Sequence, residues 1–265
     1  MSLHLRAGTS ALRRRTRSAI MRLGKEEQTR EILGHFREAR SAFNPMWRRE
    51  LRDEYAMRVA LIAILRADSN AIDVGANYGA VLESIVRLAP GGTHMAFEPI
   101  PYMQERLAKR FPTVEVRRAA LSDEAGEREF SHVLDAPAYS GLRRRGDLPA
   151  DATEVERIEV KTERLDDVLA DREHVPSLIK IDVEGAELQV LQGAHDTLER
   201  HRPFVLFEHG TGGADLYDTG PNDVFDLLDG IGLRIFDLEG SGPYSRERFE
   251  ATFTEPIWNF LAAPK

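Results

Sequence analysis

The chain has 265 residues, of which 42% are hydrophobic and 30% are charged, the composition of a globular protein with one large domain or one domain plus an extension. It contains no cysteine, which excludes disulfides, thiolate nucleophiles and cysteine metal ligands, and no apolar run approaches the roughly 18 residues of a membrane span. The net charge of -8 argues against nucleic acid as the main partner.

The charges are divided unevenly along the chain. Residues 1–66 hold 15 Lys and Arg against 7 Asp and Glu, whereas the remaining residues hold 21 against 37. This split predicts a basic helical N-terminal extension, residues 1–66, attached to an acidic domain, residues 67–265. The Arg-rich start fits a solvated helix, an organellar transit peptide or a helix on a phosphate-rich surface, and it lacks the apolar segment of a secretory signal. We expect a cytoplasmic protein, and the N-terminal helices could join two copies into a homo-oligomer.

Two helices are predicted in the extension, one on each side of the helix-breaking pair Asn44-Pro45. The second helix carries apolar residues at helical spacing, and we expect that face to pack on the domain, where one of the helices could also cover the active site. The residues of this face are Tyr55, Val59, Ile62 and Leu65.

The acidic domain alternates strand-like and helix-like segments, which predicts a doubly wound α/β sheet. The early strands are short continuous apolar runs, typical of parallel strands buried on both faces. Residues 122–168 differ, because they are rich in Asp, Glu, Gly and Pro and contain the alternating run 158–162. They predict a hairpin insertion with its tip at residues 137–151. The predicted strands of the sheet are 71–74, 95–97, 114–116, 178–181, 204–207, 233–236 and 258–262.

A glycine-containing loop, Asp73-Val-Gly75-Ala-Asn77-Tyr-Gly79, follows the first predicted strand and opens a helix. This is where an open α/β sheet binds its ligand, and glycine lets the backbone turn tightly and approach that ligand. A dinucleotide fingerprint would require G-x-G-x-x-G, whereas position 77 is Asn, so a nicotinamide cofactor is disfavoured. Asp73 would repel a phosphate but attract a cationic amino acid group.

Glu98 follows the second predicted strand, where an acidic side chain can accept hydrogen bonds from both ribose hydroxyls. Acidic residues at two successive strand ends suit S-adenosylmethionine, which carries an ammonium, a sulfonium and a ribose. Asp73 could alternatively cap the next helix, and residues 119–123 could contact adenine or form an ordinary turn. The predicted cofactor-binding residues are Asp73, Gly75, Ala76, Asn77, Gly79, Glu98, Pro99, Ala120, Leu121 and Asp182.

A second acidic segment, residues 178–187, ends another predicted strand. Lys180 lies inside this apolar strand, so its charge needs a partner or a route to water. The three carboxylates that follow, Asp182, Glu184 and Glu187, precede a helix, and helix capping alone would account for the last two. The next strand ends at Glu208-His209, and neighbouring parallel strand ends would bring these residues near Asp182.

These residues fit methyl transfer to an oxygen, which requires alignment of the reacting groups and removal of the hydroxyl proton. We predict His209 as the base, with Asp182 as its rival. The predicted catalytic residues are Lys180, Asp182, Glu184, Glu187 and His209. No metal is expected, although Asp182, Glu208 and His209 could together hold Mg²⁺ or Mn²⁺.

Taken in order, these segments resemble the FkbM family of S-adenosylmethionine-dependent methyltransferases over roughly residues 67–263. The resemblance implies a Rossmann-like seven-stranded methyltransferase sheet with an antiparallel last strand and helices on both faces. It also implies O-methylation of a hydroxyl, sometimes a carboxyl, of a sugar or natural product. The chain departs from the family at Tyr139-Ser140-Gly141-Leu142, where a Ser-Ser-Leu element is common. The resemblance rests on residues 73–79, 97–99, 120–123, 162–167, 180–187, 208–209, 232–237 and 259–261.

Three functions follow as hypotheses. The leading one is an O-methyltransferase with a small-molecule acceptor. The second is an RNA-directed methyltransferase that uses the basic extension, against which the acidic domain argues. The third is a Rossmann-like binding module without catalysis.

Overall fold

The computed structural model describes residues 45–143, 154–255 and 257–265. The chain divides into two units, Met1–Tyr55 and Ala56–Lys265, and the second contains the central α/β sheet. The first predicted helix and most of the predicted insertion tip lie outside the described residues. The division at residue 66 therefore stays a prediction.

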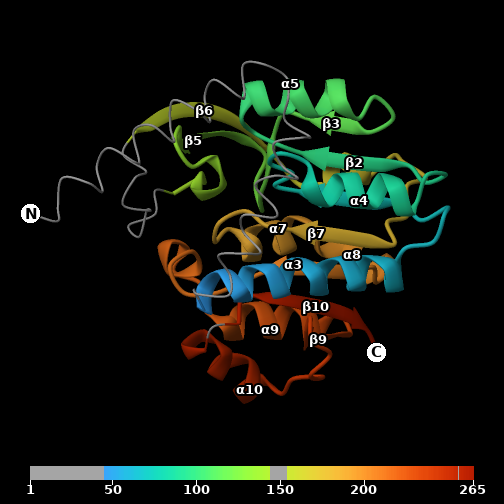
Figure 1. Cartoon of the computed structure of the whole chain (residues 1–265), viewed down its shortest axis with the longest axis vertical. Helices are drawn as coiled ribbons and strands as arrows, with labels where there is room; N and C mark the ends of the chain where they lie inside the picture. The colour runs from blue at the N-terminus through green and yellow to red at the C-terminus, as the bar shows by residue number, and fades with distance from the viewer. Residues whose placement is uncertain (1–44, 144–153, 256) are drawn as a thin grey trace, which may run out of the picture. The chain divides into compact units, whose positions relative to one another are not determined.

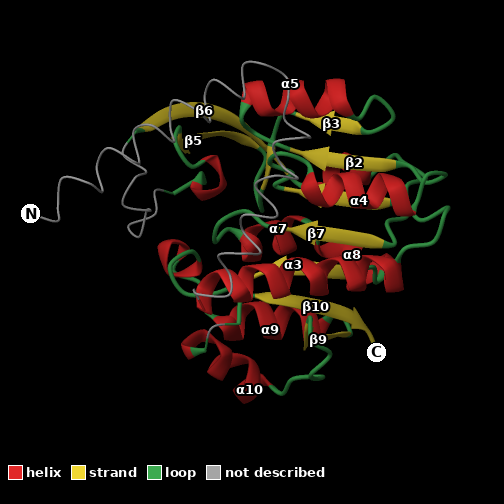
Figure 2. Cartoon of the chain, viewed as in Figure 1, coloured by secondary structure: helices red, strands yellow, loops and turns green. Residues whose placement is uncertain are grey.

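Seven strands form the central sheet, in the order β3-β2-β1-β7-β8-β10-β9 (Figures 1 and 2). The strands β3, β2, β1, β7 and β8 are mutually parallel, whereas β10 is antiparallel to both of its neighbours. This confirms the predicted Rossmann-like methyltransferase sheet with its antiparallel last strand. The strands are β1 (Ala71–Val74), β2 (His94–Phe97), β3 (Glu115–Arg117), β7 (Leu178–Ile181), β8 (Phe204–Glu208), β9 (Leu233–Asp237) and β10 (Asn259–Pro264).

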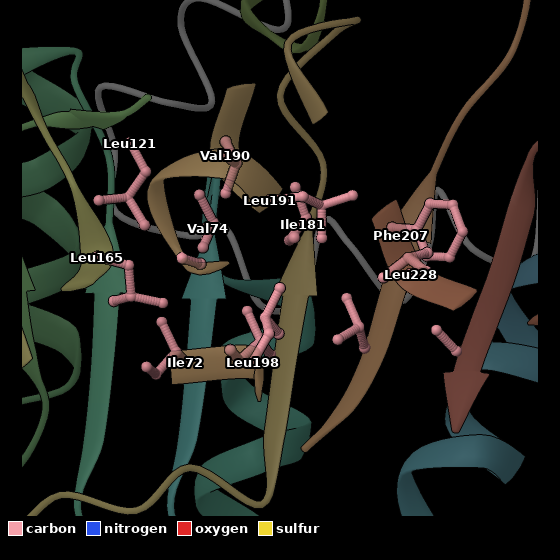
Figure 3. Packing of buried hydrophobic residues seen from close by; sticks show 14 of the residues in the cluster. Ile72, Val74, Leu121, Leu165, Ile181, Val190, Leu191, Leu198, Phe207 and Leu228 are labelled. Atoms are coloured by element: carbon pink, nitrogen blue, oxygen red, sulfur yellow. The ribbon is translucent and has the colours of Figure 1, made fainter. Parts of the chain in front are cut away.

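Helices cover both faces of the sheet. Side chains alternate between the two faces along each strand, so neighbouring residues of a strand pack against different helices. Ile72 and Val74 pack with the helices of one face, as Figure 3 shows, whereas Ala71 packs with those of the other. None of the described helices has the length and hydropathy needed to cross a membrane. The first face holds α6 (Leu165–Leu169), α7 (Glu187–Gly193), α8 (His195–His201), α9 (Pro221–Gly230) and α10 (Arg246–Ala251); the second holds α4 (Ala80–Leu88), α5 (Pro101–Arg110) and residues 56–64 of α3 (Pro45–Ile64).

The face of α3 that packs on the sheet is not the predicted one. Leu65 is buried as expected, but Val59 and Ile62 are 65% and 64% exposed. The residues that pack lie at the i, i+3, i+4, i+7 and i+8 spacing of a core-facing helix, which is a wider apolar stripe than the one we predicted. They are Met57, Ala60, Leu61, Ile64 and Leu65.

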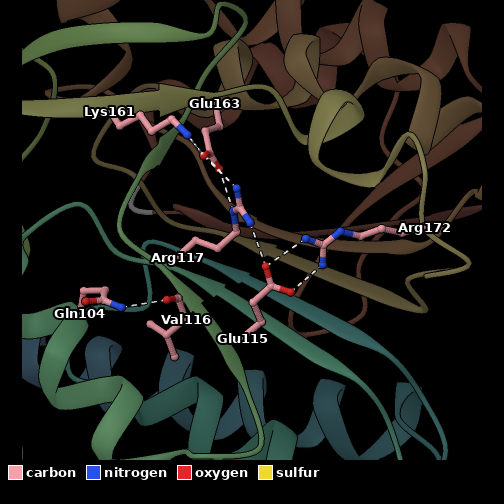
Figure 4. A network of polar contacts seen from close by, with 7 residues as sticks. All are labelled: Gln104, Glu115, Val116, Arg117, Lys161, Glu163 and Arg172. Carbon is pink, nitrogen blue, oxygen red and sulfur yellow. Dashed lines mark hydrogen bonds and ion pairs between the residues drawn. The ribbon is translucent and has the colours of Figure 1, made fainter.

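The predicted insertion region forms its own small sheet. The strands β5 (Gly126–Val133) and β6 (Val155–Glu163) pair antiparallel, and β4 (Ala120–Leu121) runs parallel to β6. Arg117, on the edge strand of the central sheet, donates to both carboxylate oxygens of Glu163 at 2.8 and 2.9 Å. This ion pair ties the insertion to the central sheet. The surrounding network in Figure 4 also includes Gln104, Glu115, Lys161 and Arg172.

Candidate active site

A cavity opens at the carboxyl ends of β1, β2 and β7, which is where an open α/β sheet binds its ligand. The insertion forms part of its wall. Twenty of the described residues line the cavity: Val74, Gly75, Asn77, Phe97, Glu98, Pro99, Ile100, Met103, Ala119, Ala120, Leu121, Phe130, Pro137, Ala138, Ser140, Leu142, Asp182, Val183, Glu184 and Ala186.

The loop after β1 passes very close to the end of β7. Gly75 has a φ of +73°, and a Cβ at this position would lie 1.9 Å from the carbonyl oxygen of Asp182. Only glycine allows both this conformation and this approach. Asn77 also has a left-handed backbone, at φ 50°, which Asn tolerates better than most residues. The loop is therefore fixed by its backbone, and its residues Gly75 and Asn77 line the cavity.

Glu98, on the cavity wall, is held in place by two backbone amides. Its Oε2 accepts a hydrogen bond from the Asn77 amide and its Oε1 one from the Ile100 amide, both at 2.9 Å. Burial raises the pKa of Glu98 to about 7, although the two amides partly oppose the shift. An ionised carboxylate has room for about four hydrogen bonds, so each oxygen can still accept one from a ligand hydroxyl.

Lys180 has the partners that its position in an apolar strand requires. Its Nζ lies 3.3 Å from Asp73 Oδ1 and 3.4 Å from Asp182 Oδ2, and it donates to the Gly75 carbonyl oxygen at 3.0 Å. Burial alone would lower the pKa of Lys180, but the carboxylates of Asp73 and Asp182 outweigh it and hold the pKa above its usual value. For Asp73, burial raises the pKa, and the lysine offsets part of that rise. The buried charges thus lie beneath the loop and support it.

The acids after β7 take different positions. Glu184 lines the cavity in a left-handed conformation, at φ 59°, which is rare for a residue other than Gly, Asn or Asp. Glu187 is buried, and its Oε1 accepts hydrogen bonds from the Val183 amide at 3.2 Å and the Gly185 amide at 3.0 Å. Glu187 therefore fixes the loop that presents Glu184.

His209 lies behind this loop and is absent from the cavity wall. Its Nδ1 is 3.9 Å from Glu187 Oε2, and its ring packs against Phe249 and Phe253. Within the described residues neither ring nitrogen has a hydrogen-bond partner. His209 follows a neighbouring strand end, as the sequence predicts, but its side chain is directed into an aromatic cluster.

The structure brings most of the predicted residues together at one edge of the sheet but not all of them at the cavity wall. Ala76 and Gly79, like Asp73, Lys180, Glu187 and His209, do not line it. The described residues contain no group of three His, Asp or Glu side chains arranged to hold a metal ion, so the alternative site of Asp182, Glu208 and His209 is not formed. The predicted residues on the cavity wall are Gly75, Asn77, Glu98, Pro99, Ala120, Leu121, Asp182 and Glu184.

Sequence reasoning missed the contact between the insertion and the loop after β8. The Oη of Tyr217 accepts a hydrogen bond from the Arg143 amide at 2.9 Å, and the Arg143 side chain donates to the Leu216 carbonyl oxygen. Burial raises the pKa of Tyr217 to about 12, so its hydroxyl stays protonated. The alternating pattern of the insertion could have indicated Phe130, which lines the cavity, but no local signal connects positions 143 and 217.

Comparison with known proteins identifies the family. The model of the methyltransferase FkbM domain matches residues 73–229, more than half of the chain. The chain belongs to the FkbM methyltransferase family. It is therefore a methyltransferase of the type that uses S-adenosylmethionine. The FkbM match begins at Asp73 and ends within α9, so it includes the strand ends that carry the acids of the site and the whole insertion.

Two curated relatives support this assignment, and one solved structure is also similar. The chain is similar to the 31-O-demethyl-FK506 methyltransferase FkbM of Streptomyces tacrolimicus, with 32% identity over 205 residues, covering 64% of this chain and 75% of the relative. It is also similar to the methyltransferase sdnD of Sordaria araneosa, with 30% identity over 167 residues, or 51% of this chain and 64% of the relative. A solved FkbM methyltransferase from Methylobacillus flagellatus KT is 17% identical, with a TM-score of 0.46, and covers 75% of this chain and 44% of that one.

Proposed function

We propose that this FkbM-family protein transfers the methyl group of S-adenosylmethionine to a hydroxyl oxygen of a small molecule, a sugar or a natural product. The observation that carries the proposal is the pairing of Glu98 and Asp182 on the wall of one cavity. The first is suited to a ribose and the second to a hydroxyl proton. The name of the Streptomyces relative supports the choice of acceptor atom, because it specifies a substrate that lacks a methyl group on an oxygen.

The residues of the cavity fit the cofactor. Glu98 is held by two backbone amides and can accept the ribose hydroxyls on its remaining lone pairs. Ala120 and Leu121, which form β4, offer apolar side chains on the cavity wall for an adenine ring. When bound, S-adenosylmethionine would supply a methyl group on a cationic sulfur, which an oxygen nucleophile can attack directly.

Asp182 is the better-placed base for the acceptor hydroxyl. Its side chain is 40% exposed and belongs to the cavity wall, whereas the side chain of His209 is fully buried outside it. Lys180, 3.4 Å from Asp182 Oδ2, would keep the carboxylate oriented. In this proposal His209 is a positioning residue that packs behind Glu187 and the loop of Glu184. A positioned base contributes roughly 10²–10⁴-fold to such a reaction.

Calorimetry with S-adenosylhomocysteine tests the cofactor half of the proposal. The native chain should bind it, and Glu98→Gln should bind about 10–100-fold more weakly, because hydrogen bonds to a charged group are lost. Glu105→Gln is the matched control, since Glu105 is an exposed carboxylate on α5 outside the cavity wall. A native chain that folds but does not bind S-adenosylhomocysteine would refute the proposal.

The pH dependence of the same binding sharpens the test. The ribose hydroxyls donate to the ionised form of Glu98, whose pKa in the free protein is about 7. Lowering the pH from 8 to 6 protonates this carboxylate, so binding should weaken about tenfold. The Glu98→Gln variant should lose this dependence. Equal pH profiles for the native chain and the variant would remove Glu98 from the ribose site.

A further inference from the structure

The adenine ring of a bound cofactor would lie beside Glu98. The proposed function assigns the ribose hydroxyls to Glu98, and a single bond joins the ribose to the adenine ring. Glu98 Oε1 accepts a hydrogen bond from the Ile100 amide at 2.9 Å, and Ile100 is itself a buried residue of the cavity wall. The wall next to Ile100 is therefore the part that the adenine ring would contact.

One hydrophobic cluster forms this part of the wall. Its buried members Ile100, Met103, Ala120 and Phe130 all line the cavity. Ile100 and Met103 lie at the start of α5, Ala120 lies in β4, and Phe130 lies in β5 of the insertion. Phe130 contributes an aromatic ring to this wall, whereas the other three side chains have none.

The insertion holds the ring of Phe130 in place. Phe130 lies opposite Ile158 in the antiparallel pair of β5 and β6, and it is 5% exposed. The next residue, Ser131, exchanges two backbone hydrogen bonds with Gly141, at 2.8 and 3.2 Å. The ring is therefore in position before a ligand binds, which lowers the entropy cost of binding.

The insertion reaches two sides of the cavity with different segments. Phe130 lies on the proposed cofactor side, in one cluster with Ala120. The segment 140–143 lies on the proposed acceptor side, where a Cβ on Gly141 would be 3.7 Å from Glu184 Cβ and 3.6 Å from Tyr217 Oη. The contact of Phe130 with a ligand can therefore be tested separately from the acceptor side.

We infer that Phe130 contacts the adenine ring of S-adenosylmethionine, so that the insertion forms part of the cofactor site. The inference rests on the proposed function. Aromatic side chains pack on other rings by offset stacking or edge to face, and the purine of the cofactor is such a ring. Stacking of a nucleobase on an aromatic side chain changes an affinity roughly 5–100-fold.

Nuclear Overhauser effects test the contact directly. The full chain is labelled on its Phe rings in a deuterated background and saturated with S-adenosylhomocysteine. Adenine H2 or H8 should show an effect to one Phe ring, and that signal should be absent from Phe130→Leu. Phe130→Tyr, which keeps the ring but shifts its signals, provides the same assignment if Phe130→Leu does not fold. If S-adenosylhomocysteine binds and its adenine protons show no effect to Phe130, the inference is wrong.

Calorimetry measures what the contact contributes. Phe130→Leu should bind S-adenosylhomocysteine at least fivefold more weakly than the native chain. It should still lose about tenfold in affinity between pH 8 and pH 6, because that dependence comes from Glu98 and the ribose. Loss of the pH dependence in Phe130→Leu would show that Phe130 acts through Glu98 and would overturn its assignment to adenine. An affinity within twofold of the native value would overturn the contribution of the ring.

The controls separate this inference from the proposed function. Phe225→Leu alters a partly buried ring on α9 outside the cavity wall and should bind S-adenosylhomocysteine within twofold of the native chain. A fivefold loss in this variant as well would attribute the effect of Phe130→Leu to general destabilisation and overturn the inference. Failure of the folded native chain to bind S-adenosylhomocysteine would overturn the proposed function itself.

Discussion

The proposed cofactor side and the proposed acceptor side of the cavity are built in different ways. The cofactor side is built on strand ends, where backbone amides hold Glu98 and where Lys180 is 5% exposed between two carboxylates. The acceptor side consists of residues 140–143 of the insertion and the loop after β8, joined by Arg143 and Tyr217, and the Arg143 side chain is 53% exposed. The first is fixed by buried groups that tolerate little change. The second is held by contacts near water, which sequence change can alter without loss of the fold.

The largest effect is expected for removal of the buried lysine on the cofactor side. Lys180→Met would leave Asp73 and Asp182 without their shared cation, and breaking a buried ion pair costs about 3–5 kcal/mol. Urea unfolding should show this loss in the free energy of unfolding. Lys109→Met, on an exposed position of α5, is the matched control and should change it by less than about 0.5 kcal/mol.

A second substitution shows whether Lys180→Met destabilises the protein by leaving carboxylates without a cation or by loss of packing. Adding Asp73→Asn to Lys180→Met removes one of the uncompensated carboxylates, so the double variant should be more stable than Lys180→Met alone. A double variant that is less stable by the sum of both single effects would show that the three charged groups do not act as a unit.

Substitution of one glycine on each side compares the rigidity of the two sides directly. Gly75→Ala would place a Cβ 1.9 Å from the Asp182 carbonyl oxygen in a left-handed conformation, whereas Gly141→Ala would place one at ordinary contact distances of 3.5–3.7 Å. We expect Gly75→Ala to weaken S-adenosylhomocysteine binding more than tenfold, because the loop that holds Asn77 must move. Gly141→Ala should change this affinity by less than twofold. Similar losses in both would contradict the difference in rigidity between the two sides.

On the proposed cofactor side, the sequence predicted well which strand ends lie together. Parallel strands end at one edge of a sheet, so Asp73, Glu98 and Asp182 had to lie near one another once the strands were recognised. The need of Lys180 for a partner followed from its apolar neighbours, and the structure supplies two. What the pattern did not determine was side-chain direction: Asp73 is directed beneath the loop and His209 into an aromatic cluster, so neither reaches the cavity wall.

The acceptor side could not be predicted in the same way, because its contacts are not local. Arg143 and Tyr217 are 74 positions apart, and nothing in either turn-rich segment specifies the other. The left-handed backbone of Glu184 is equally invisible in sequence, and so is the close approach of the next residue, Gly185, to Gly213. On α3 the predicted buried face was wrong for another reason. The helix carries two apolar stripes, and the prediction took the narrower one.

The smallest predicted effect concerns the contact that closes the acceptor side. Tyr217→Phe removes the oxygen that accepts the Arg143 amide hydrogen bond, which is worth about 1 kcal/mol, so hydrogen exchange at this amide should become about fivefold faster. Binding of S-adenosylhomocysteine should stay within twofold, because the cofactor side does not depend on this bond. Tyr244→Phe, which removes a hydrogen bond to Asp237, should leave the exchange at Arg143 unchanged. If Tyr217→Phe instead weakened cofactor binding more than tenfold, the two sides would be mechanically coupled, and the independence inferred from their construction would be lost.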